Sequence, residues 1–535
     1  MNRTKARDTA VDSTTRRVLG IADYLECVRP RSQTSQERWK QLPSAGGLDD
    51  DATRRELQLL ARLDEELSSA LIDDVDGDLR GLPTLERPLR RLNAEQVLRD
   101  ADFFELKRFF FHGVSIIRTL DGAAELPAVD SAIVDLFVEA METLHPGNAW
   151  SRRFHLADEL DEQLAQLRSE LRDRRQRLKS KRRNLEAAIT GDHAGTFDIH
   201  GCFRPEDGAH VDDDRLVDCG DGRYRVEDTE LRELEQQLEA LRDDVAAEEH
   251  RQRRRLTTFI ANIQAPITEL HERLVEFDLR LTRIDLRRCI GGCWPTIGSN
   301  TPLHIDVDAG RDPTLLQTMD HSNIQPIDLE LTGLGTVVLG PNMGGKSSVL
   351  RLVGALAWCA KMALPVPADR CRIPSFDGIV YIGSEASEAG EEARGLSSFG
   401  REIRRFVEFW QSDGPTLWLL DEPCRGTHPG EGTQLAAAIA RQRTEAGDTV
   451  VMSTHFPGLA EASNFSRLRI AGLDVDDETL RHTLDGEPQD GRRLHERLVE
   501  LMDYRVVADN DGDVPRDGWR IARALGLDIP RPDRA

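Results

Sequence analysis

The sequence lacks the marks of a membrane protein and of a disulfide-bonded protein. No run approaches the roughly 18 uncharged apolar residues that span a bilayer, and no signal peptide is evident. We therefore expect a soluble, cytoplasmic chain without membrane contacts. The eight cysteines are scattered, and the closest pair, Cys289 and Cys293, has a spacing that matches no common zinc or redox motif. This pattern predicts reduced thiols.

Lysine is almost absent, and arginine supplies nearly all of the positive charge. Seven of the 71 Lys and Arg residues are lysines, which leaves 64 arginines, and 95 acidic residues bring the formal net charge to −24. Nucleic-acid binding draws much of its free energy from Lys and Arg displacing counterions, so any DNA contact of this chain must be local. A GC-rich genome or a salt-rich cytoplasm would also account for this composition.

The chain has 535 residues, enough for three or four domains of roughly 150 residues each. Helical signals cover residues 51–150, with Asn93 as a candidate N-cap three residues before Gln96. From residue 156 leucines recur at three- and four-residue spacing, and a second such stripe begins at Leu231. The Gly- and Asp-rich residues 191–226 lie between the stripes. This order predicts two long antiparallel helices joined by a small irregular tip.

The charges along this helical hairpin are complementary when the chain folds back about the tip. The Arg-rich residues 174–183 then face the acidic residues 230–239, and the Arg-rich residues 251–255 face the acidic residues 158–162. Ion pairs between the two solvent-exposed helices of the hairpin would explain these charged runs. Binding of the basic runs to the DNA backbone is the alternative. The tip itself is acidic, a charge that repels phosphate.

A buried-strand pattern at residues 336–339 leads into a glycine-rich loop and then a helical run. Backbone N–H groups of such a loop converge on phosphates at the positive end of the new helix. Lys346 would reach the β and γ oxygens, and Ser347 would bind Mg²⁺. The sequence therefore predicts a P-loop site for ATP and Mg²⁺. Its predicted phosphate-binding residues are Gly340, Pro341, Asn342, Met343, Gly344, Gly345, Lys346, Ser347 and Ser348.

Two later strand patterns end in further candidate site residues. The apolar residues 417–420 are followed by Asp421 and Glu422, and residues 450–454 are followed by His455. Because the carboxyl ends of parallel strands meet at one edge of a sheet, these groups should lie beside the P-loop. Asp421 suits the Mg²⁺ shell and the nucleotide site, and Glu422 suits orienting or deprotonating the attacking water. His455 can bond to the γ-phosphate or the water, so Glu422, His455 and Lys346 form the predicted catalytic set.

These motifs resemble those of MutS-family ATPases. The loop from Gly340 to Ser347 matches that family's phosphate loop nearly letter for letter, and residues 397–402 resemble the signature segment that MutS dimers insert into the partner's site. Asp421 and Glu422 with residues 425–427 resemble the Walker B motif and its adjoining loop. The resemblance covers roughly residues 150 to 530. Its further matches are Val366, Pro367, Ala368, Thr454 with His455, residues 310–313, Gly518, Ile521, Ala522 and Gly526.

The resemblance implies a homodimer, or a heterodimer with another MutS-like chain. Ser397 or Ser398 of one chain would contact the γ-phosphate bound by Lys346 of the other. The implied fold class is multidomain α and α/β, with a helical core and lever, a long antiparallel clamp hairpin and a P-loop NTPase domain of the ABC/MutS type. The expected divisions are an N-terminal extension (1–50), a helical core (51–150), the lever and clamp hairpin (151–295, tip 191–226), the ATPase domain (296–485) and a C-terminal helical segment (486–535).

The chain also departs from the pattern of mismatch-repair MutS proteins. Its length leaves no room for both a mismatch-reading domain and a connector domain. Residues 103–105, Phe-Phe-Glu, match the Phe-x-Glu motif in form, but they lie in a phenylalanine-rich helical pattern, for which we expect core packing. Residues 323–328 only loosely match the family's adenine-binding pattern. Pro423 and Cys424 replace the small-residue step usual after the Walker B pair.

Two functional hypotheses follow. The first is a dimeric DNA-binding ATPase that couples hydrolysis to clamp movement on DNA, in a mismatch-repair or recombination-like role without mismatch reading by a Phe-x-Glu motif. The second is a MutS-like ATPase that remodels a protein partner, such as an adenosylcobalamin-dependent aminomutase, as one short MutS-like branch does. The acidic tip and net charge agree better with the second hypothesis, and the frequency of DNA-linked functions in the family favours the first.

Overall fold

The computed structural model divides into two compact units. The mixed unit comprises residues 1–31, 35–72 and 276–535, and the helical unit comprises residues 32–34 and 73–275. Among the residues described, no helix is both long and apolar enough to cross a membrane. The structure describes residues 11–120, 131–147, 154–206, 210–299, 303–316, 324–341, 344–383, 397–411, 414–455, 458–459, 465–473, 475–484, 501–509, 517–524 and 527.

The helical unit has a core rich in phenylalanine. Phe103 is fully buried and packs against Phe154 with ring centroids 5.1 Å apart, while Glu105 pairs with Arg87 at 3.2 Å. The prediction that the Phe-x-Glu match belongs to the core is therefore confirmed. The helices of this unit are α6 (Glu86–Asn93), α7 (Asp100–Leu120), α8 (Ser131–Leu144), η2 (Asp158–Leu160), α9 (Glu162–Asp192) and α10 (Thr229–Asn262), with parts of α5 (Ser69–Gly81) and α11 (Gln264–Ile290).

The helix boundary predicted at Asn93 is wrong. Asn93 is the last residue of α6, and α7 begins seven residues later, at Asp100. The side chain of Asp102, in the first turn of α7, accepts a hydrogen bond from the Arg99 N–H at 2.8 Å. This hydrogen bond joins the backbone just before α7 to a side chain in the first turn and stabilises the start of the helix. A cap at Asn93 is therefore not needed.

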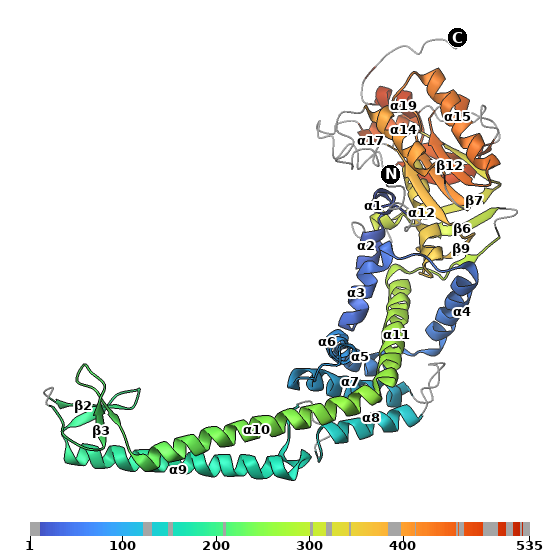
Figure 1. Ribbon diagram of the computed structural model, residues 1–535. Coiled ribbons are helices and arrows are strands. Elements are labelled where there is room, and N and C mark those ends of the chain that lie inside the picture. Colours follow the sequence, from blue (N-terminus) through green and yellow to red (C-terminus); the bar gives the residue numbers. More distant parts are fainter. Residues whose placement is uncertain are drawn as a thin grey trace. The chain divides into compact units, whose positions relative to one another are not determined.

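Helices α9 and α10 run side by side and form the predicted hairpin (Figure 1). Asp161 and Asp228 cap their N-termini by accepting hydrogen bonds from Leu164 N at 3.0 Å and Leu231 N at 2.8 Å. The predicted pairing of residues 174–183 with residues 230–239 is confirmed at Lys181, which bonds to Glu230. The predicted pairing of residues 251–255 with residues 158–162 does not occur among the described contacts, and Arg251 instead donates to Gln163 at 2.9 Å. A further ion pair between α9 and α10, Arg168 with Glu249 at 2.8 Å, lies outside the predicted runs.

The tip is a small folded sheet and is more regular than predicted. Strands β1 (Gly195–Phe197), β2 (Cys202–Pro205), β3 (Leu216–Asp218) and β4 (Tyr224–Val226) pair antiparallel in the order β1-β2-β4-β3. Buried Phe203 and Tyr224 from the sheet pack with Ile189 of α9, which gives the tip its own apolar cluster. Strands of three or four residues leave too little alternating pattern to be read from the sequence.

The mixed unit contains a six-stranded sheet in the order β10-β11-β12-β8-β13-β14 and a second sheet in the order β5-β9-β6-β7. In the six-stranded sheet only the β13–β14 pair is antiparallel. The strands are β5 (Thr296–Ile297), β6 (His304–Gly310), β7 (Ile327–Thr332), β8 (Gly335–Leu339), β9 (Arg370–Ile373), β10 (Gly378–Ile382), β11 (Thr416–Asp421), β12 (Thr449–Thr454), β13 (Ser466–Leu473) and β14 (Met502–Ala508).

Helices cover both faces of the six-stranded sheet. Along β11, Leu417 and Leu419 pack in the apolar cluster that contains α12, while Trp418 and Leu420 pack in the cluster that contains residues of α14 and α15. This alternation buries both faces, which explains the continuous apolar runs of these strands. The helices of the unit are α1 (Ser13–Val18), α2 (Ile21–Glu26), α3 (Gln33–Gln41), η1 (Leu42–Ser44), α4 (Asp50–Glu66), η4 (Pro313–Leu315), α12 (Lys346–Lys361), α14 (Ser398–Phe409), α15 (Pro429–Glu445), α17 (Asp477–Leu484) and α19 (Asp517–Ala524).

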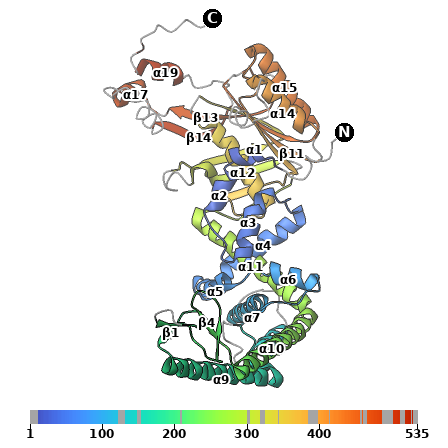
Figure 2. The same ribbon diagram turned by 60° about the vertical axis from the view of Figure 1, so that its left-hand side comes forward.

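The C-terminal segment, expected to be helical, contains a strand as well as α19. Strand β14 pairs antiparallel with β13 at the edge of the six-stranded sheet (Figure 2). Its apolar residues Met502 and Val506 contact apolar clusters of the unit, so tertiary packing fixes the strand. The other residues of that segment for which helix was expected, 486–500, 510–516, 525–526 and 528–535, lie outside the described residues. All eight cysteines are free in the structure.

Candidate nucleotide-binding site

The predicted P-loop connects β8 to α12. Strand β8 ends at Leu339, and the 16-residue helix α12 begins at Lys346. Gly345 precedes the helix with φ of 87°, a conformation that favours glycine, and the Gly344 N–H donates to the Pro341 carbonyl at 3.1 Å. The loop therefore leads to the positive end of a long helix, where anions are stabilised. Asn342 and Met343 lie outside the described residues.

Lys346 is held inside the loop by polar atoms on two sides. Its Nζ donates to the carbonyl oxygens of Gly340 at 3.1 Å and Pro341 at 2.9 Å, and it lies 3.7 Å from Glu422 Oε1. Burial lowers the pKa of the Lys346 ammonium, and the nearby carboxylates of Glu422 and Asp421 oppose this shift. The side chain is thus fixed next to the loop backbone and the carboxylates that end β11.

Asp421, the last residue of β11, accepts hydrogen bonds from three hydroxyl groups. Its Oδ2 accepts from Ser347 Oγ and from Tyr381 Oη, each at 2.7 Å, and its Oδ1 accepts from Ser453 Oγ. Strands β10, β11 and β12 and helix α12 each supply one member of this group. The carboxylate is therefore oriented from both neighbouring strands and from the P-loop helix.

Glu422 lies between three positively charged or titratable side chains. Its Oε1 is 3.3 Å from His455 Nδ1 and 3.7 Å from Lys346 Nζ, and its Oε2 accepts from Arg425 Nη1 at 2.8 Å. Its backbone has φ of 47°, a left-handed conformation that costs a non-glycine residue about 1 kcal/mol. The Glu422 N–H donates to the Ser453 carbonyl at 3.2 Å, which helps to hold this conformation. Strained backbone of this kind often occurs at functional sites.

The structure brings together Lys346, Ser347, Asp421, Glu422 and His455, and it gives three other predicted residues separate contacts. Ser348 accepts from Arg351 Nη2 at 3.0 Å. Ser397 caps α14 by accepting from the Gly400 N–H at 3.1 Å, and Ser398 Oγ lies against Gly426. Within the described part of the chain, no hydrogen bond joins Ser397 or Ser398 to the P-loop. The catalytic, metal-binding and partner-site roles of all these residues stay predictions.

Three residues of the site were not assigned from the sequence. Tyr381 and Ser453 orient Asp421, and Glu402 accepts from the Cys424 N–H at 2.7 Å. Burial raises the pKa of the Glu402 carboxyl. Ser453 lies near the end of β12, two residues before the predicted His455, so its position at the sheet edge could have been found by the argument used for Asp421. Tyr381 and Glu402 carry no such signal, because their contacts depend on tertiary packing.

Comparison with known proteins identifies the domain that contains this site. Residues 336–491 match the family model described as MutS domain V. "Endonuclease MutS2" of Thermomicrobium roseum is 33% identical over 273 residues, which are 48% of this chain and 34% of that protein. "Endonuclease MutS2" of Solidesulfovibrio magneticus is 31% identical over 238 residues, 44% of this chain and 30% of that protein.

A mismatch-repair protein also matches. "DNA mismatch repair protein MutS" of Natronomonas pharaonis is 25% identical over 410 residues, which are 71% of this chain and 47% of that protein. The chain thus spans about a third of the length of the MutS2 relatives and about half of this MutS protein. MutS domain V is an ATPase domain, which implies that this domain uses ATP. This chain therefore contains a MutS domain V, which is an ATPase domain, and is similar over part of its length to MutS2 and MutS proteins.

Proposed function

We propose that the chain is a Mg²⁺-dependent ATPase in which Glu422 activates the attacking water. The observation that carries this proposal is the position of Glu422, with Lys346, His455 and Arg425 all within 3.7 Å of its carboxylate. Lys346 would exchange its carbonyl partners for phosphate oxygens, and His455 would hold Glu422 and the water in line with the γ-phosphate. Such positioning and electrostatic stabilisation supply most of the catalysis in phosphoryl transfer.

The oxygen atoms of Ser347 and Asp421 fit a magnesium ion. Mg²⁺ prefers oxygen ligands and takes one or two from the protein, with the rest from water and phosphates. The Ser347 hydroxyl and the Asp421 carboxylate lie 2.7 Å apart, so both can face one ion. Among the described residues there is no group of three His, Cys, Asp or Glu side chains able to hold a metal, which agrees with a site completed by the nucleotide. The ion would neutralise charge on the β and γ oxygens.

We further propose that the functional unit is a dimer in which Ser397 and Ser398 complete the partner's site. Both serines are exposed, and Ser397 starts α14, whose first N–H groups form the positive end of that helix. An exposed helix start of this kind is suited to contact a γ-phosphate bound elsewhere. The resemblance of residues 397–402 to the MutS signature segment supports the same arrangement.

Replacing both Ser397 and Ser398 by alanine should lower ATP hydrolysis about tenfold or more and leave ATP binding to the single chain intact. Mixing this variant with Lys346→Ala should restore part of the activity, since a mixed dimer then holds one site with both Lys346 and the two serines. ATP turnover of the separate and mixed variants measures this. Asp49→Ala, which removes the N-cap of α4, controls for the loss of a helix cap. Unchanged turnover in the double variant, or no recovery on mixing, would remove the case for a shared site.

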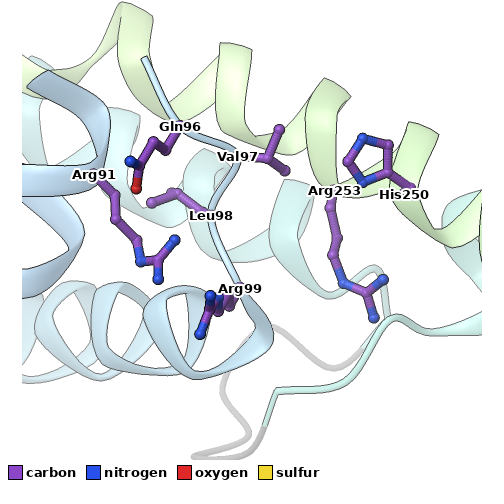
Figure 3. Close-up of a pocket in the computed structure, with 7 residues that line it drawn as sticks. All are labelled: Arg91, Gln96, Val97, Leu98, Arg99, His250 and Arg253. Atoms are coloured by element: carbon purple, nitrogen blue, oxygen red, sulfur yellow. The ribbon is translucent and has the colours of Figure 1, made fainter. Parts of the chain in front are cut away.

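We propose DNA as the substrate on which this ATPase acts. The names of the relatives, an endonuclease and a DNA mismatch repair protein, support this choice. A local basic surface exists in the helical unit, where Arg91, Arg99, His250 and Arg253 line a cavity of about 510 Å³ beside α10 (Figure 3). Carboxylates pair with two of these arginines. Arg91 pairs with Asp102 at 3.3 Å, and Arg253 pairs with Asp100 at 2.7 Å.

The guanidinium of Arg99 at this cavity is available to a phosphate. Among the residues described, neither Arg99 nor His250 has a carboxylate partner, and both side chains are exposed. A phosphodiester group held there would be close to the fixed guanidinium groups of Arg91 and Arg253. Because the chain is acidic overall, we expect few such contacts and a modest salt dependence of DNA binding.

Arg99→Ala should weaken duplex or branched DNA binding about five- to tenfold and reduce the slope of log affinity against log salt by about one. The measurement is a salt series of DNA binding, run together with steady-state ATPase assays with homoduplex, mismatched and branched DNA. Arg99→Lys keeps the charge and should retain most of the affinity, and Arg54→Ala removes an equal charge from the exposed face of α4. If Arg99→Ala binds DNA as tightly as the parent, the cavity is not the DNA-binding site. If none of the DNA structures changes the rate of ATP hydrolysis, that result would count against DNA as the substrate.

A second candidate function, remodelling of a protein partner, is favoured by the surface of the tip. Ile199, in the turn between β1 and β2, is 95% exposed, and Val217 of β3 is 39% exposed beside exposed acidic side chains of the tip. Apolar side chains within an acidic surface suit a basic protein partner better than a phosphate backbone. The aminomutase-reactivating branch of MutS-like proteins is the model for this alternative. Robust ATPase activity without any response to DNA, together with stimulation by such an enzyme, would establish it in place of the first.

A further inference from the structure

The N-terminal segment, residues 11–27, is built into the fold of the mixed unit. Val11 pairs in parallel with Ile379 of β10, the edge strand of the six-stranded sheet. Helices α1 and α2 lie beside α12 (Figures 1 and 2). Leu19 is fully buried, and its Cδ2 is within 2.6 Å of where a Cβ on Gly354 of α12 would lie. The segment thus packs on the helix that begins at the P-loop lysine.

Two consecutive hydrogen bonds connect this segment to the Asp421 carboxylate. Thr15, which is fully buried, accepts a hydrogen bond at its Oγ1 from the Tyr381 N–H at 3.1 Å. The Tyr381 hydroxyl donates to Asp421 Oδ2 at 2.7 Å, and the Tyr381 side chain is also fully buried. Since β10 is an edge strand, its outward N–H groups need acceptors from outside the sheet. Thr15 supplies such an acceptor at the residue that holds Asp421.

A second connection leads from the same segment to α14. Asp12 caps α1 by accepting from the Thr14 N–H at 2.9 Å, and its Oδ2 lies 3.2 Å from Arg405 Nη2. Arg405, in α14, also donates to the Tyr381 carbonyl at 3.0 Å. Helix α14 begins directly after Ser397. The segment therefore contacts both the residue that orients Asp421 and the helix that carries the exposed serines at its start.

We propose that residues 11–15 are a positioning element of the nucleotide site. Thr15 and Asp12 act through Tyr381 and Arg405 to hold the Asp421 carboxylate and α14 in the geometry that Mg²⁺ and ATP require. A carboxylate whose rotamer is already fixed loses less conformational freedom when it binds an ion, so its affinity is higher. The inference rests on the proposed Mg²⁺ site at Ser347 and Asp421, and it adds Tyr381 and Thr15 as positioning residues.

The first test is a Mg²⁺ titration of ATP binding and hydrolysis by the full chain, comparing the parent with Tyr381→Phe. The variant keeps the buried ring and loses only the hydroxyl that holds Asp421. We expect the half-saturating Mg²⁺ concentration to rise about five- to tenfold, with ATP binding in the absence of Mg²⁺ unchanged and kcat at saturating Mg²⁺ near the parent value. If the Tyr381 hydroxyl only stabilised the fold, its loss would affect ATP binding with and without Mg²⁺ alike.

The second test asks whether Thr15 and Tyr381 act together. Thr15→Val should raise the half-saturating Mg²⁺ concentration in the same direction, and Thr15→Ser should restore it because serine keeps the acceptor. In the double variant Thr15→Val with Tyr381→Phe, the combined effect should be less than the product of the single effects, as expected for two residues that act on the same carboxylate. Tyr24→Phe is the matched control, because it removes another buried hydroxyl, which donates to the Pro365 carbonyl at 2.6 Å.

The outcomes separate this inference from the proposed function. A parent protein whose ATP binding and hydrolysis ignore Mg²⁺ would refute the proposed metal site. A parent that depends on Mg²⁺, with a Tyr381→Phe variant of the same Mg²⁺ dependence, would overturn the positioning role alone. Effects of Thr15 and Tyr381 that simply multiply, or an equal shift in Tyr24→Phe, would overturn it as well. The expected pattern is a shift in Tyr381→Phe and Thr15→Val and none in Tyr24→Phe.

Discussion

Replacing Glu422 by glutamine should lower steady-state ATP hydrolysis by a factor of about 10² to 10⁴ while ATP binding stays close to that of the parent. Glutamine has nearly the same shape and still offers an oxygen to Arg425, but it cannot accept a proton from the attacking water. The amide also removes the negative charge next to Lys346, so the ammonium is left with phosphate oxygens as its main anionic partners. We therefore expect the variant to accumulate in an ATP-bound, closed dimer.

Three measurements test this prediction. Steady-state phosphate release gives the rate, equilibrium binding of a labelled nucleotide gives the affinity, and size-exclusion chromatography with ATP reports the trapped dimer. Glu431→Gln is the matched control, since it makes the same chemical change at an exposed carboxylate that accepts from Thr427 Oγ1 at 3.2 Å. Turnover at the parent rate in Glu422→Gln would show that another group orients the water.

The nucleotide site was predictable because its parts obey local rules. A P-loop is one contiguous stretch, and the polar residues after β11 and β12 meet it because parallel strands end at one edge of a sheet. The pairing of Asp421 with Ser453 across β11 and β12 follows from that register. Lys346, Ser347, Asp421, Glu422 and His455 could therefore be placed near one another without coordinates.

The orientation of Asp421 could not be predicted in the same way. Tyr381 lies on the edge strand β10, and its N–H is satisfied by Thr15, which is 366 residues away along the chain. No periodicity or motif in residues 11–27 marks such a contact, because it arises when α1 packs on the sheet edge. Strand β14 was not predicted for the same reason, because tertiary packing fixes its position beside β13.

One local sequence signal in the helical unit gave a wrong helix boundary. Asn93 and Gln96 have the spacing of a capping box, yet Asn93 ends α6 and the Gln96 N–H donates to the Arg91 carbonyl at 2.9 Å. Asp102 forms the stabilising bond at the start of α7 instead. In the hairpin, by contrast, leucine spacing and charge runs agreed with each other, and the prediction of two paired helices was confirmed. A prediction supported by two independent sequence signals was therefore more accurate than the one based on the capping-box spacing alone.

Replacing Lys346 by alanine should weaken ATP binding about a hundredfold or more, a loss of about 3 kcal/mol. The ammonium lies against both the loop carbonyls and Glu422. Because it is buried, its interaction with the phosphates is weakly screened by water. Its removal leaves Glu422 facing the phosphate oxygens with less positive charge to offset the repulsion. Hydrolysis should fall with binding, which distinguishes this variant from Glu422→Gln.

A thermal-shift experiment measures this loss without requiring turnover. A ligand present at about 100 times its Kd stabilises the folded state by about 2.7 kcal/mol, so the parent should melt several degrees higher with Mg²⁺ and ATP than without them. Lys346→Ala should lose most of this increase. Lys361→Ala removes an equal charge from the other end of α12, where the side chain pairs with Asp377 at 3.4 Å, and it should keep the full increase. An undiminished increase in Lys346→Ala would mean that the phosphates are held by the loop backbone and the helix end alone.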